Sequence, residues 1–259
     1  MENRPEWALI LGGSSGLGLA TAKKLAKEGF HILIVHRDRK SDLETIQKDF
    51  EEIAVKSILH SFNQDATNPV KRNELIQEVK ELIGIDKIRV LVHSIAKGNL
   101  KPMQGESDKI LSNQDFHLTI DAMAISLYDW VDTLVEEKLF AEDARVIAFT
   151  SEGNSKAWKN YAAVSAAKAA LEAITRNIAL EFAQVGIKAN CIQAGVTDTR
   201  SLQMIPNSDI LKKEALKRSP NNRLTTPEDV ANVVYLLTRE EAKWITGTVL
   251  KVDGGESLQ

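Results

Sequence analysis

The sequence predicts an α/β fold, a doubly wound parallel sheet of about seven strands with helices on both faces. Short apolar runs rich in β-branched residues alternate with longer amphipathic stretches from end to end. Runs such as ILIV at 32–35 and VLV at 90–92 are apolar without interruption, which is typical of parallel strands covered on both faces. Right-handed crossovers between such strands give the doubly wound arrangement.

Each expected strand is a short apolar run bounded by polar or turn-forming residues. The expected strands are Trp7–Leu11, His31–His36, Val55–His60, Ile88–His93, Arg145–Thr150, Ile187–Gln193 and Thr248–Val252. Helices are expected between them, for example at Leu19–Gly29 and from near Pro227. No repeat or linker interrupts the pattern, so the 259 residues are expected to form one domain, 1–259. The irregular segment 196–222 follows the sixth strand and is expected to be a substrate lid, since loops at these strand ends carry the ligand site.

The composition excludes several classes of function. The formal charge of −3 argues against nucleic acid as a partner, because binding phosphates needs a basic surface. The single cysteine, Cys191, cannot form a disulfide within the chain, which favours a reducing, cytoplasmic location. Neither a signal peptide nor a membrane span is expected from the apolar runs. The five histidines lack metal-ligand spacing, so no metal site is expected.

A glycine-rich turn joins the first strand to the first helix. Glycines at this turn let the backbone approach a pyrophosphate, which then lies at the positive end of the helix dipole. Because a strand precedes the turn and a helix follows it, the segment is expected to bind a dinucleotide in a Rossmann-type fold. The cofactor-binding residues expected here are Gly12, Ser14, Ser15, Gly16, Leu17 and Gly18.

The residues after the second strand favour NADPH over NADH. Arg37 follows the strand directly, and an arginine there can pair with the 2′-phosphate of NADP. Asp38 is the counter-argument, because an acid at this point can instead accept the ribose hydroxyls of NAD. Asp65 and Ala66 are placed to meet the adenine, with a helix-capping turn as the alternative. The main chain of Ser94, Ile95 and Ala96 is expected to run past the cofactor ribose; His93 is either an acid–base group or a core histidine, and the core role is favoured.

Tyr161 precedes Lys168 by seven residues in YAAVSAAK, and Val164 holds the position four before the lysine. On a helix, residues four and seven apart return to nearly the same face. Tyr161 and Lys168 therefore suggest a catalytic pair whose phenol lies about one turn further along the helix than a residue four before the lysine would. A phenol so placed can reach an oxygen further down a conjugated substrate.

Several motifs now resemble those of the short-chain dehydrogenase/reductase superfamily over nearly the whole chain. They are the glycine loop, Asp65-Ala66, Ser151, 186–190 (GIKAN), 194–199 (AGVTDT), 227–231 (PEDVA) and 252–255 (VDGG). Most members place the tyrosine four before the lysine. The seven-residue spacing is similar to that of the enoyl-acyl-carrier-protein reductases of this superfamily, as are 92–96 (VHSIA) and Asp121. Ser151 stands where the commonest of those enzymes have a second tyrosine, and it resembles a divergent NADPH-using branch.

The resemblance implies roles for further residues. Tyr161 would stabilise an enolate oxygen, Lys168 would hold the nicotinamide ribose, and Ser151 would assist the oxygen or line the pocket. Main-chain groups of Val196 and Thr197 would orient the carboxamide, Thr199 would reach a phosphate, and Gly195 would also bind the cofactor. The implied activity is NAD(P)H-dependent reduction of the C=C bond of a trans-2-enoyl thioester in fatty acid synthesis. A carbonyl reductase of the 3-ketoacyl type and a non-catalytic nucleotide-binding protein are the alternatives.

The resemblance also implies partners. The Ala-rich run 162–173 is expected to pack between subunits of a homo-oligomer, a dimer or a tetramer. The substrate is expected to be an acyl thioester linked to an acyl carrier protein. Lys212, Lys213, Lys217 and Arg218 on the lid are either a docking patch for that acidic carrier or an ordinary solvated helix face.

Overall fold

The computed structural model describes residues 6–106, 109–205 and 208–259. It confirms the expected fold class, with one parallel sheet of seven strands in the order β3-β2-β1-β4-β5-β6-β7. The strands are β1 (Trp7–Leu11), β2 (His31–His36), β3 (Leu59–Asn63), β4 (Ile88–His93), β5 (Phe140–Thr150), β6 (Ile187–Ala194) and β7 (Val249–Val252). The strand order reverses direction between β1 and β4, and a crevice at the carboxyl ends of such a pair is where α/β proteins bind ligands.

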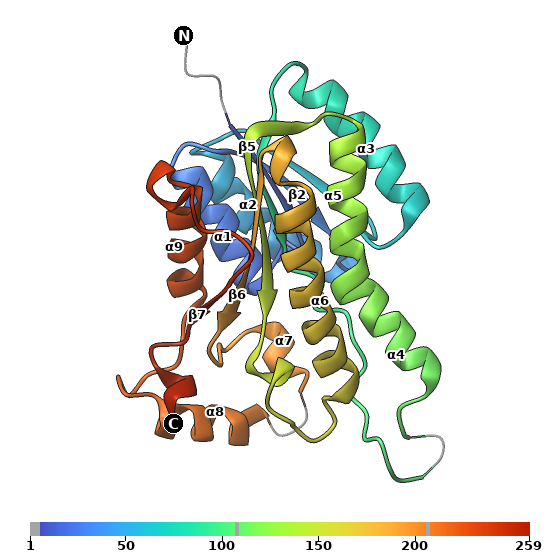
Figure 1. Ribbon diagram of the computed structural model, residues 1–259, viewed down its shortest axis with the longest axis vertical. Helices are drawn as coiled ribbons and strands as arrows, with labels where there is room; N and C mark the ends of the chain where they lie inside the picture. The colour runs from blue at the N-terminus through green and yellow to red at the C-terminus, as the bar shows by residue number, and fades with distance from the viewer. Residues whose placement is uncertain (1–5, 107–108, 206–207) are drawn as a thin grey trace.

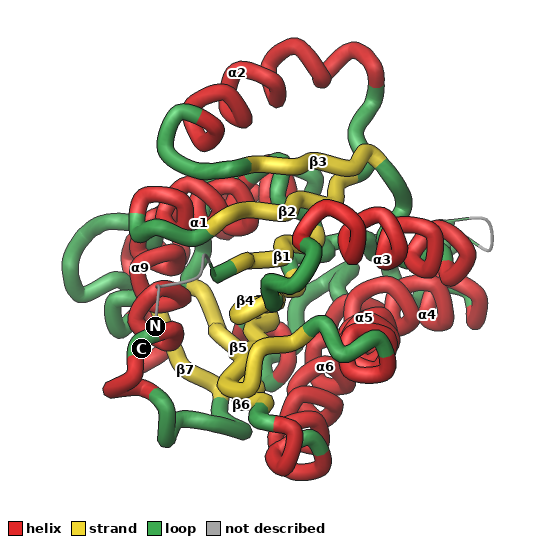
Figure 2. The backbone as a smooth tube through the Cα atoms, turned by 90° about the horizontal axis from the view of Figure 1, so that it is seen from above, coloured by secondary structure: helices red, strands yellow, loops and turns green. Residues whose placement is uncertain are grey.

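Helices cover both faces of this sheet (Figures 1 and 2). One layer consists of α1 (Gly16–Lys27), α2 (Leu43–Ala54) and α9 (Pro227–Thr238), and the other of α3 (Pro69–Ile83), α4 (Asn113–Ile120), α5 (Ser126–Glu136) and α6 (Ala162–Glu181). A π-helix at Asp121–Ile125 joins α4 to α5. Two short helices, α7 (Arg200–Gln203) and α8 (Ser208–Arg218), lie at the end of the molecule toward which β5 and β6 point (Figure 1).

Alternate strand residues enter two separate cores. Leu9 and Leu33 face the core built with α3, α5 and α6, whereas Ile10 and Ile34 face the core built with α1, α2 and α9. Both sets are fully buried, which is why the strands are apolar without interruption.

The third predicted strand was wrong in position. Val55–His60 was expected, but β3 covers Leu59–Asn63 and pairs with β2 from Ile32↔Leu59 onward. Val55 instead caps the end of α2 and is 85% exposed. The cause is the edge position of β3: only Phe62 in this strand is buried, so apolar sequence is a poor guide to its bounds. The fifth and sixth strands are longer than predicted, and the seventh starts one residue later.

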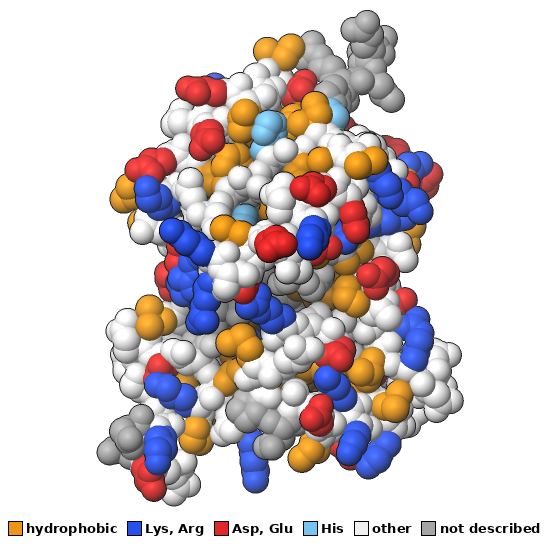
Figure 3. Space-filling view, turned by 180° about the vertical axis from the view of Figure 1, so that it is seen from behind, with side chains coloured by type: hydrophobic (Ala, Val, Ile, Leu, Met, Phe, Trp, Pro, Cys, Tyr) orange, Lys and Arg blue, Asp and Glu red, His pale blue; other side chains and the backbone are white. Residues whose placement is uncertain are grey.

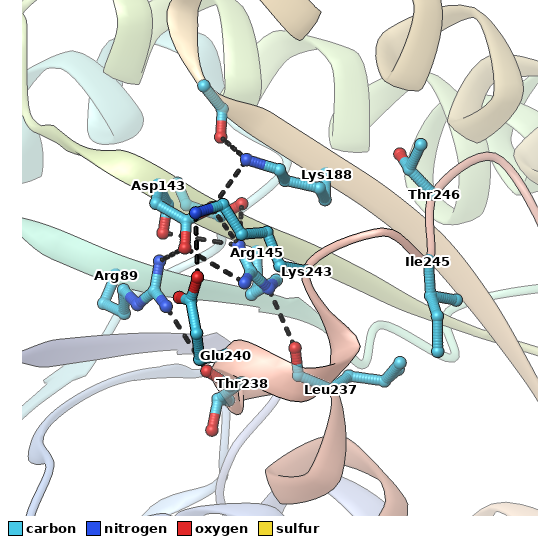
Figure 4. Close-up of polar contacts among 12 residues, drawn as sticks. Arg89, Asp143, Arg145, Lys188, Leu237, Thr238, Glu240, Lys243, Ile245 and Thr246 are labelled. Atoms are coloured by element: carbon cyan, nitrogen blue, oxygen red, sulfur yellow. Dashed lines mark hydrogen bonds and ion pairs between the residues drawn. The ribbon is translucent and has the colours of Figure 1, made fainter.

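A cluster of charges ties the start of β5 to the end of α9 (Figure 4). The Asp143 carboxylate forms ion pairs with Arg89, Arg145 and Lys188, each at 2.6 Å. Arg145 is 1% exposed, and its Nε donates to the Leu237 carbonyl oxygen, one of the carbonyls left free at the end of α9. Burial opposes ionisation, but hydrogen bonds from these three cations hold the pKa of Asp143 well below its usual range.

Candidate active site

The glycine loop between β1 and α1 is shaped by close backbone contacts. Gly12 and Gly16 have φ of +83° and +54°, a region that L side chains rarely adopt. A β-carbon on Gly12 would lie 2.5 Å from the Ser94 carbonyl oxygen, and one on Gly18 would lie 2.2 Å from the Gly12 carbonyl oxygen. The loop therefore needs glycine at these positions to lie against β4 and against its own helix.

The amino end of α1 faces a cleft at the carboxyl edge of the sheet. Ser15 precedes the helix without a side-chain cap, and no acidic residue occupies the first turn, so the helix dipole is left available to an anion. The cleft brings together most of the expected cofactor residues from four parts of the chain. Its lining includes Gly12, Ser15, Gly16, Leu17, Ser94, Ile95, Ala96, Lys168 and Thr199. Ser14 lines a neighbouring groove with Ser15 and Gly16.

Arg37, Asp65 and Ala66 do not line this cleft. Arg37 donates to the Asp65 carboxylate at 2.9 Å, and Lys97 contacts the same oxygen at 3.2 Å. Burial alone would raise the pKa of Asp65, but hydrogen bonds from Thr67 and Lys97 lower it to about 2. The capping-turn alternative for Asp65 describes this geometry, since its Oδ1 accepts from both the amide and the hydroxyl of Thr67.

Asp38 is also engaged by neighbours. Its carboxylate lies 2.8 Å from His36 Nδ1, and its amide donates to Asn63 Oδ1. Asp38 therefore stabilises the turn after β2. The space-filling view from behind shows Lys and Arg side chains gathered at mid-height, with acidic side chains beside them (Figure 3).

Tyr161 directly precedes α6, and Lys168 lies within that helix. Tyr161 is the N-cap residue, 8% exposed, and its Oη lies 3.4 Å from Ser151 Oγ. Lys168 is buried, and its Nζ donates to the Phe149 carbonyl oxygen at 2.6 Å. Val164 is buried in the same cluster as Tyr161, at the position one turn nearer the lysine.

The protonation of these groups is set by burial. Burial lowers the pKa of Lys168 to about 8, while the nearby Cys191 and Glu172 raise it in part. Burial raises the pKa of Tyr161, and the hydrogen bond from Ser151 offsets this only partly. The pKa of Tyr161 is thus set by burial and Ser151, while the Lys168 ammonium is directed at the Phe149 carbonyl oxygen. His93 is 1% exposed and its pKa falls to about 3, through burial and the charge of Lys168, so it is a neutral core histidine.

A mostly apolar cavity adjoins the cleft, with Tyr161 and Ser151 in its wall. The two hollows share Leu17, Ala96, Thr150, Thr199 and Ser201. The expected lid segment contributes several walls of the cavity. They are Val196, Thr197, Thr199, Ser201, Leu202 and Ile205. Gly195 lines it as well, and a β-carbon there would lie 2.4 Å from Thr225 Oγ1.

Sequence reasoning missed a group of charges beside this cavity. Arg218 of α8 donates to both carboxylate oxygens of Glu152 and, at 2.6 Å, to Glu256. Glu256 also accepts the Val196 amide at 2.9 Å, so that amide is not free to orient a carboxamide. Arg218 thus belongs to the site rather than to a docking patch. The three residues are far apart in the chain and share no motif, so no local pattern could have paired them.

The fold, together with the cleft and the cavity that adjoins it, is that of an oxidoreductase of the short-chain dehydrogenase/reductase superfamily. The sequence model of the family described as "Enoyl-(Acyl carrier protein) reductase" matches residues 12–257, and the chain belongs to that family.

Individual relatives differ in the reaction that their names describe. The chain is 27% identical over 248 residues to a 3-oxoacyl-[acyl-carrier-protein] reductase of Staphylococcus epidermidis, covering 96% of this chain and 97% of that protein. It is 27% identical over 259 residues to the 1-cyclohexenylcarbonyl-CoA reductase of Streptomyces collinus, covering 99% of this chain and 88% of that protein.

Solved structures agree on the fold. The enoyl-[acyl-carrier-protein] reductase (NADH) of Aquifex aeolicus superposes with a TM-score of 0.84 at 24% identity, covering 98% of this chain and 97% of that one. A short-chain dehydrogenase of Burkholderia cenocepacia in complex with NADP gives a TM-score of 0.82 at 25% identity, covering 97% of this chain and 98% of that one. Within the described residues, no helix is long and apolar enough to span a bilayer.

Proposed function

We propose that this protein is an NADPH-dependent enoyl thioester reductase, which reduces the C=C bond of a trans-2-enoyl thioester in fatty acid synthesis. The observation that carries the proposal is the placement of Tyr161. Val164 fills the wall of the cavity one turn nearer Lys168, so the phenol enters the cavity from the very start of α6. A donor set back in this way suits an oxygen that is not on the carbon being reduced.

The electronics of an enoyl thioester fit this placement. When the β-carbon is reduced, negative charge develops on the thioester oxygen, whose carbon lies two bonds away. A preorganised hydrogen-bond donor aimed at that oxygen stabilises the enolate. Because burial raises the pKa of Tyr161, the phenol stays protonated at neutral pH and can act as such a donor. The Ser151 hydroxyl, 3.4 Å from the phenol oxygen, would reach the same substrate oxygen.

The cleft beside the cavity suits a nicotinamide dinucleotide. The uncapped amino end of α1 and the close contacts of Gly12 and Gly18 leave a backbone surface that a pyrophosphate can approach. The cofactor would supply the hydride. Lys168 would hold its nicotinamide ribose, the Thr197 main chain its carboxamide, and Thr199 a phosphate; Asp65 and Ala66 would flank the adenine.

NADPH is proposed over NADH because Arg37 follows β2 and its side chain is 60% exposed. Asp38, the residue that would favour NAD, has its carboxylate engaged by His36. The Burkholderia relative is in complex with NADP, whereas the Aquifex enzyme is named for NADH, so relatives of both kinds exist.

A carrier protein is the proposed donor of the acyl group. Lys213 and Lys217 lie on the exposed side of α8, next to the exposed Ile210 and Leu216. This surface suits an acidic carrier protein that also offers apolar contacts. We also propose a homo-oligomer, because Leu118, Ile125 and Tyr128 are more than 40% exposed around the junction of α4 and α5, which neighbour α6.

The names of the relatives support two reactions. A 1-cyclohexenylcarbonyl thioester carries a C=C bond conjugated to its carbonyl, which is the substrate chemistry proposed here. The Staphylococcus enzyme is instead a 3-oxoacyl reductase. Carbonyl reduction is the second candidate, favoured by the Ser151–Tyr161 pair, since two hydroxyls can converge on a single carbonyl oxygen. A protein that only bound nucleotide would not need Tyr161 and Lys168 together.

One assay separates the two candidates. NADPH oxidation is followed with crotonyl and with acetoacetyl thioester, for the wild type and for Tyr161→Phe. The proposal expects crotonyl reduction by the wild type and a loss of about 10²–10³ in kcat for the variant, the usual cost of one oxyanion donor. Reduction of the acetoacetyl substrate alone would overturn the proposal in favour of a carbonyl reductase.

A further inference from the structure

Glu172 lies on α6 one turn after Lys168 and is half-buried. Its Oε1 accepts two hydrogen bonds, from Thr150 Oγ1 at 2.6 Å and from Asn154 Nδ2 at 2.5 Å. The carboxylate is therefore used to hold a loop, and it does so at both ends of a five-residue segment.

That segment, 150–154, forms the surface against which Tyr161 rests. Ser151 presents its hydroxyl to the phenol oxygen. Gly153 lies directly under the ring, because a β-carbon there would be 2.5 Å from Tyr161 Cε1. Tyr161 itself precedes the first turn of α6 and follows Asn160, which has φ of +63°. The helix alone does not fix the phenol, and the segment supplies the contacts to its ring edge and its hydroxyl.

Glu172 also acts on Lys168 through its charge. Burial lowers the pKa of Lys168 to about 8, and the negative charge of Glu172 is one of two contributions that raise it. Glu172 thus acts on both residues of the proposed catalytic pair. It affects Tyr161 through the hydrogen bonds that hold segment 150–154, and Lys168 through the electrostatic effect of its charge.

We propose that Glu172 is a positioning residue of this active site, which clamps segment 150–154 to α6 and so sets the place of the Tyr161 phenol and the Ser151 hydroxyl. The inference rests on the proposed catalytic role of Tyr161. It does not depend on which bond is reduced, because both candidate reactions use the same phenol.

The test compares Glu172→Gln with Glu172→Ala. Both hydrogen bonds end on one oxygen, so a glutamine can keep them with its amide oxygen while removing the charge. The alanine variant releases both donors. A displacement of about 1 Å at a reacting group costs about 10²-fold. Glu172→Ala is therefore expected to lose about 10²-fold in kcat with little change in the KM for NADPH, and Glu172→Gln to retain most of the wild-type kcat at pH 7.

The charge is tested by the pH profile. Without the carboxylate, Lys168 loses a contribution that raises its pKa, so its ammonium should deprotonate at lower pH. The alkaline limb of the kcat profile is expected to move to lower pH in Glu172→Gln, even though its rate at pH 7 is near normal. Glu181→Ala and Glu181→Gln, at the exposed end of the same helix, are the controls and should change neither quantity.

A readout independent of turnover keeps this inference separate from the proposed function. Hydrogen exchange of the amides in 151–156, measured on the full chain, is expected to speed up in Glu172→Ala but not in Glu172→Gln. Unchanged exchange in the alanine variant would overturn the clamp, whatever the enzyme reduces. A glutamine variant as impaired as alanine, with the wild-type pH profile, would overturn it as well. Should Glu172→Ala not fold, Asn154→Ala takes its place. This variant removes one of the two donors, and the amides of 151–156 should exchange faster in it than in the wild type.

Discussion

Replacing Gly153 with alanine should disable the active site without unfolding the protein. Gly153 lies in a 3₁₀ turn and does not adopt a left-handed conformation, so the backbone accepts alanine. The added methyl would, however, lie 2.5 Å from Tyr161 Cε1 and 2.8 Å from Cδ1. Carbon atoms pack at about 3.5–4.0 Å, so the ring has to retreat by about 1 Å.

The retreat of the ring fixes the size of the effect. The phenol oxygen moves with the ring and leaves the position 3.4 Å from Ser151 Oγ. Misplacing a reacting group by about 1 Å costs about 10²-fold, so kcat is expected to fall by about that factor. The affinity for NADPH should be unaffected, because the cleft that contains Lys168 is not lined by Gly153.

The assay is a double-mutant cycle on kcat with Gly153→Ala and Tyr161→Phe. In the Tyr161→Phe background the donor is already lost, so Gly153→Ala should cost less than about threefold more. Equal losses in the two backgrounds would show that Gly153 acts on something other than the phenol. A single variant with near wild-type kcat would show that the ring is not held as the structure indicates.

Arg37→Ala is expected to raise the KM for NADPH far more than the KM for NADH, and equal changes would remove the argument for NADPH. Charge reversal at Lys213 and Lys217 should slow reduction of carrier-linked substrate and spare the coenzyme A thioester; identical effects on both would end the docking idea. Arg218→Gln removes the cation paired with the buried Glu256 and leaves Glu152 with Lys156 alone, so it should cost about 3 kcal/mol of stability, against less than about 0.5 for Lys217→Gln, as read from thermal unfolding. Asp143→Asn should cost a similar amount at pH 7. Because burial is outweighed by three cations that lower the pKa of Asp143, its contribution is present at neutral pH and lost as pH falls below about 4, so wild type and variant should converge in acid.

The fold could be predicted where burial is complete and not where it is partial. β1, β2 and β4 lie in the interior of the sheet and match their predicted bounds. Both faces of these strands are buried, so nearly every residue in them has to be apolar. β3 lies at the sheet edge, and there the apolar Val55 and Ile58 are exposed, 85% and 50%. Hydrophobicity does not mark the bounds of this edge strand, which are set by pairing with β2.

The site follows the same division. The shared cleft of the glycine loop, Ser94 and Lys168 could be expected from sequence, because each of them lies at a fixed place relative to a strand or helix. Glu152, Arg218 and Glu256 could not, since their pairing joins segments 66 and 38 residues apart and depends on how the irregular segment 196–222 folds. The ion pair of Arg37 with Asp65 could not be predicted for a similar reason. It forms because the carboxyl ends of the adjacent strands β2 and β3 lie side by side.

The spacing of Tyr161 and Lys168 carries less information than helical periodicity suggests. The expectation of one continuous helical face assumed that both residues are helical, yet Tyr161 has φ of −113° and ψ of 3° and stands outside α6. Its ring is located by Gly153 and Trp158, whose ring lies 5.1 Å away between centroids, and its hydroxyl by Ser151. With this spacing, Val164 occupies the position one turn nearer Lys168, and contacts with segment 150–154 set the position of the phenol. The choice between C=C and C=O reduction is, on this argument, a property of segment 150–154 and its anchor on α6.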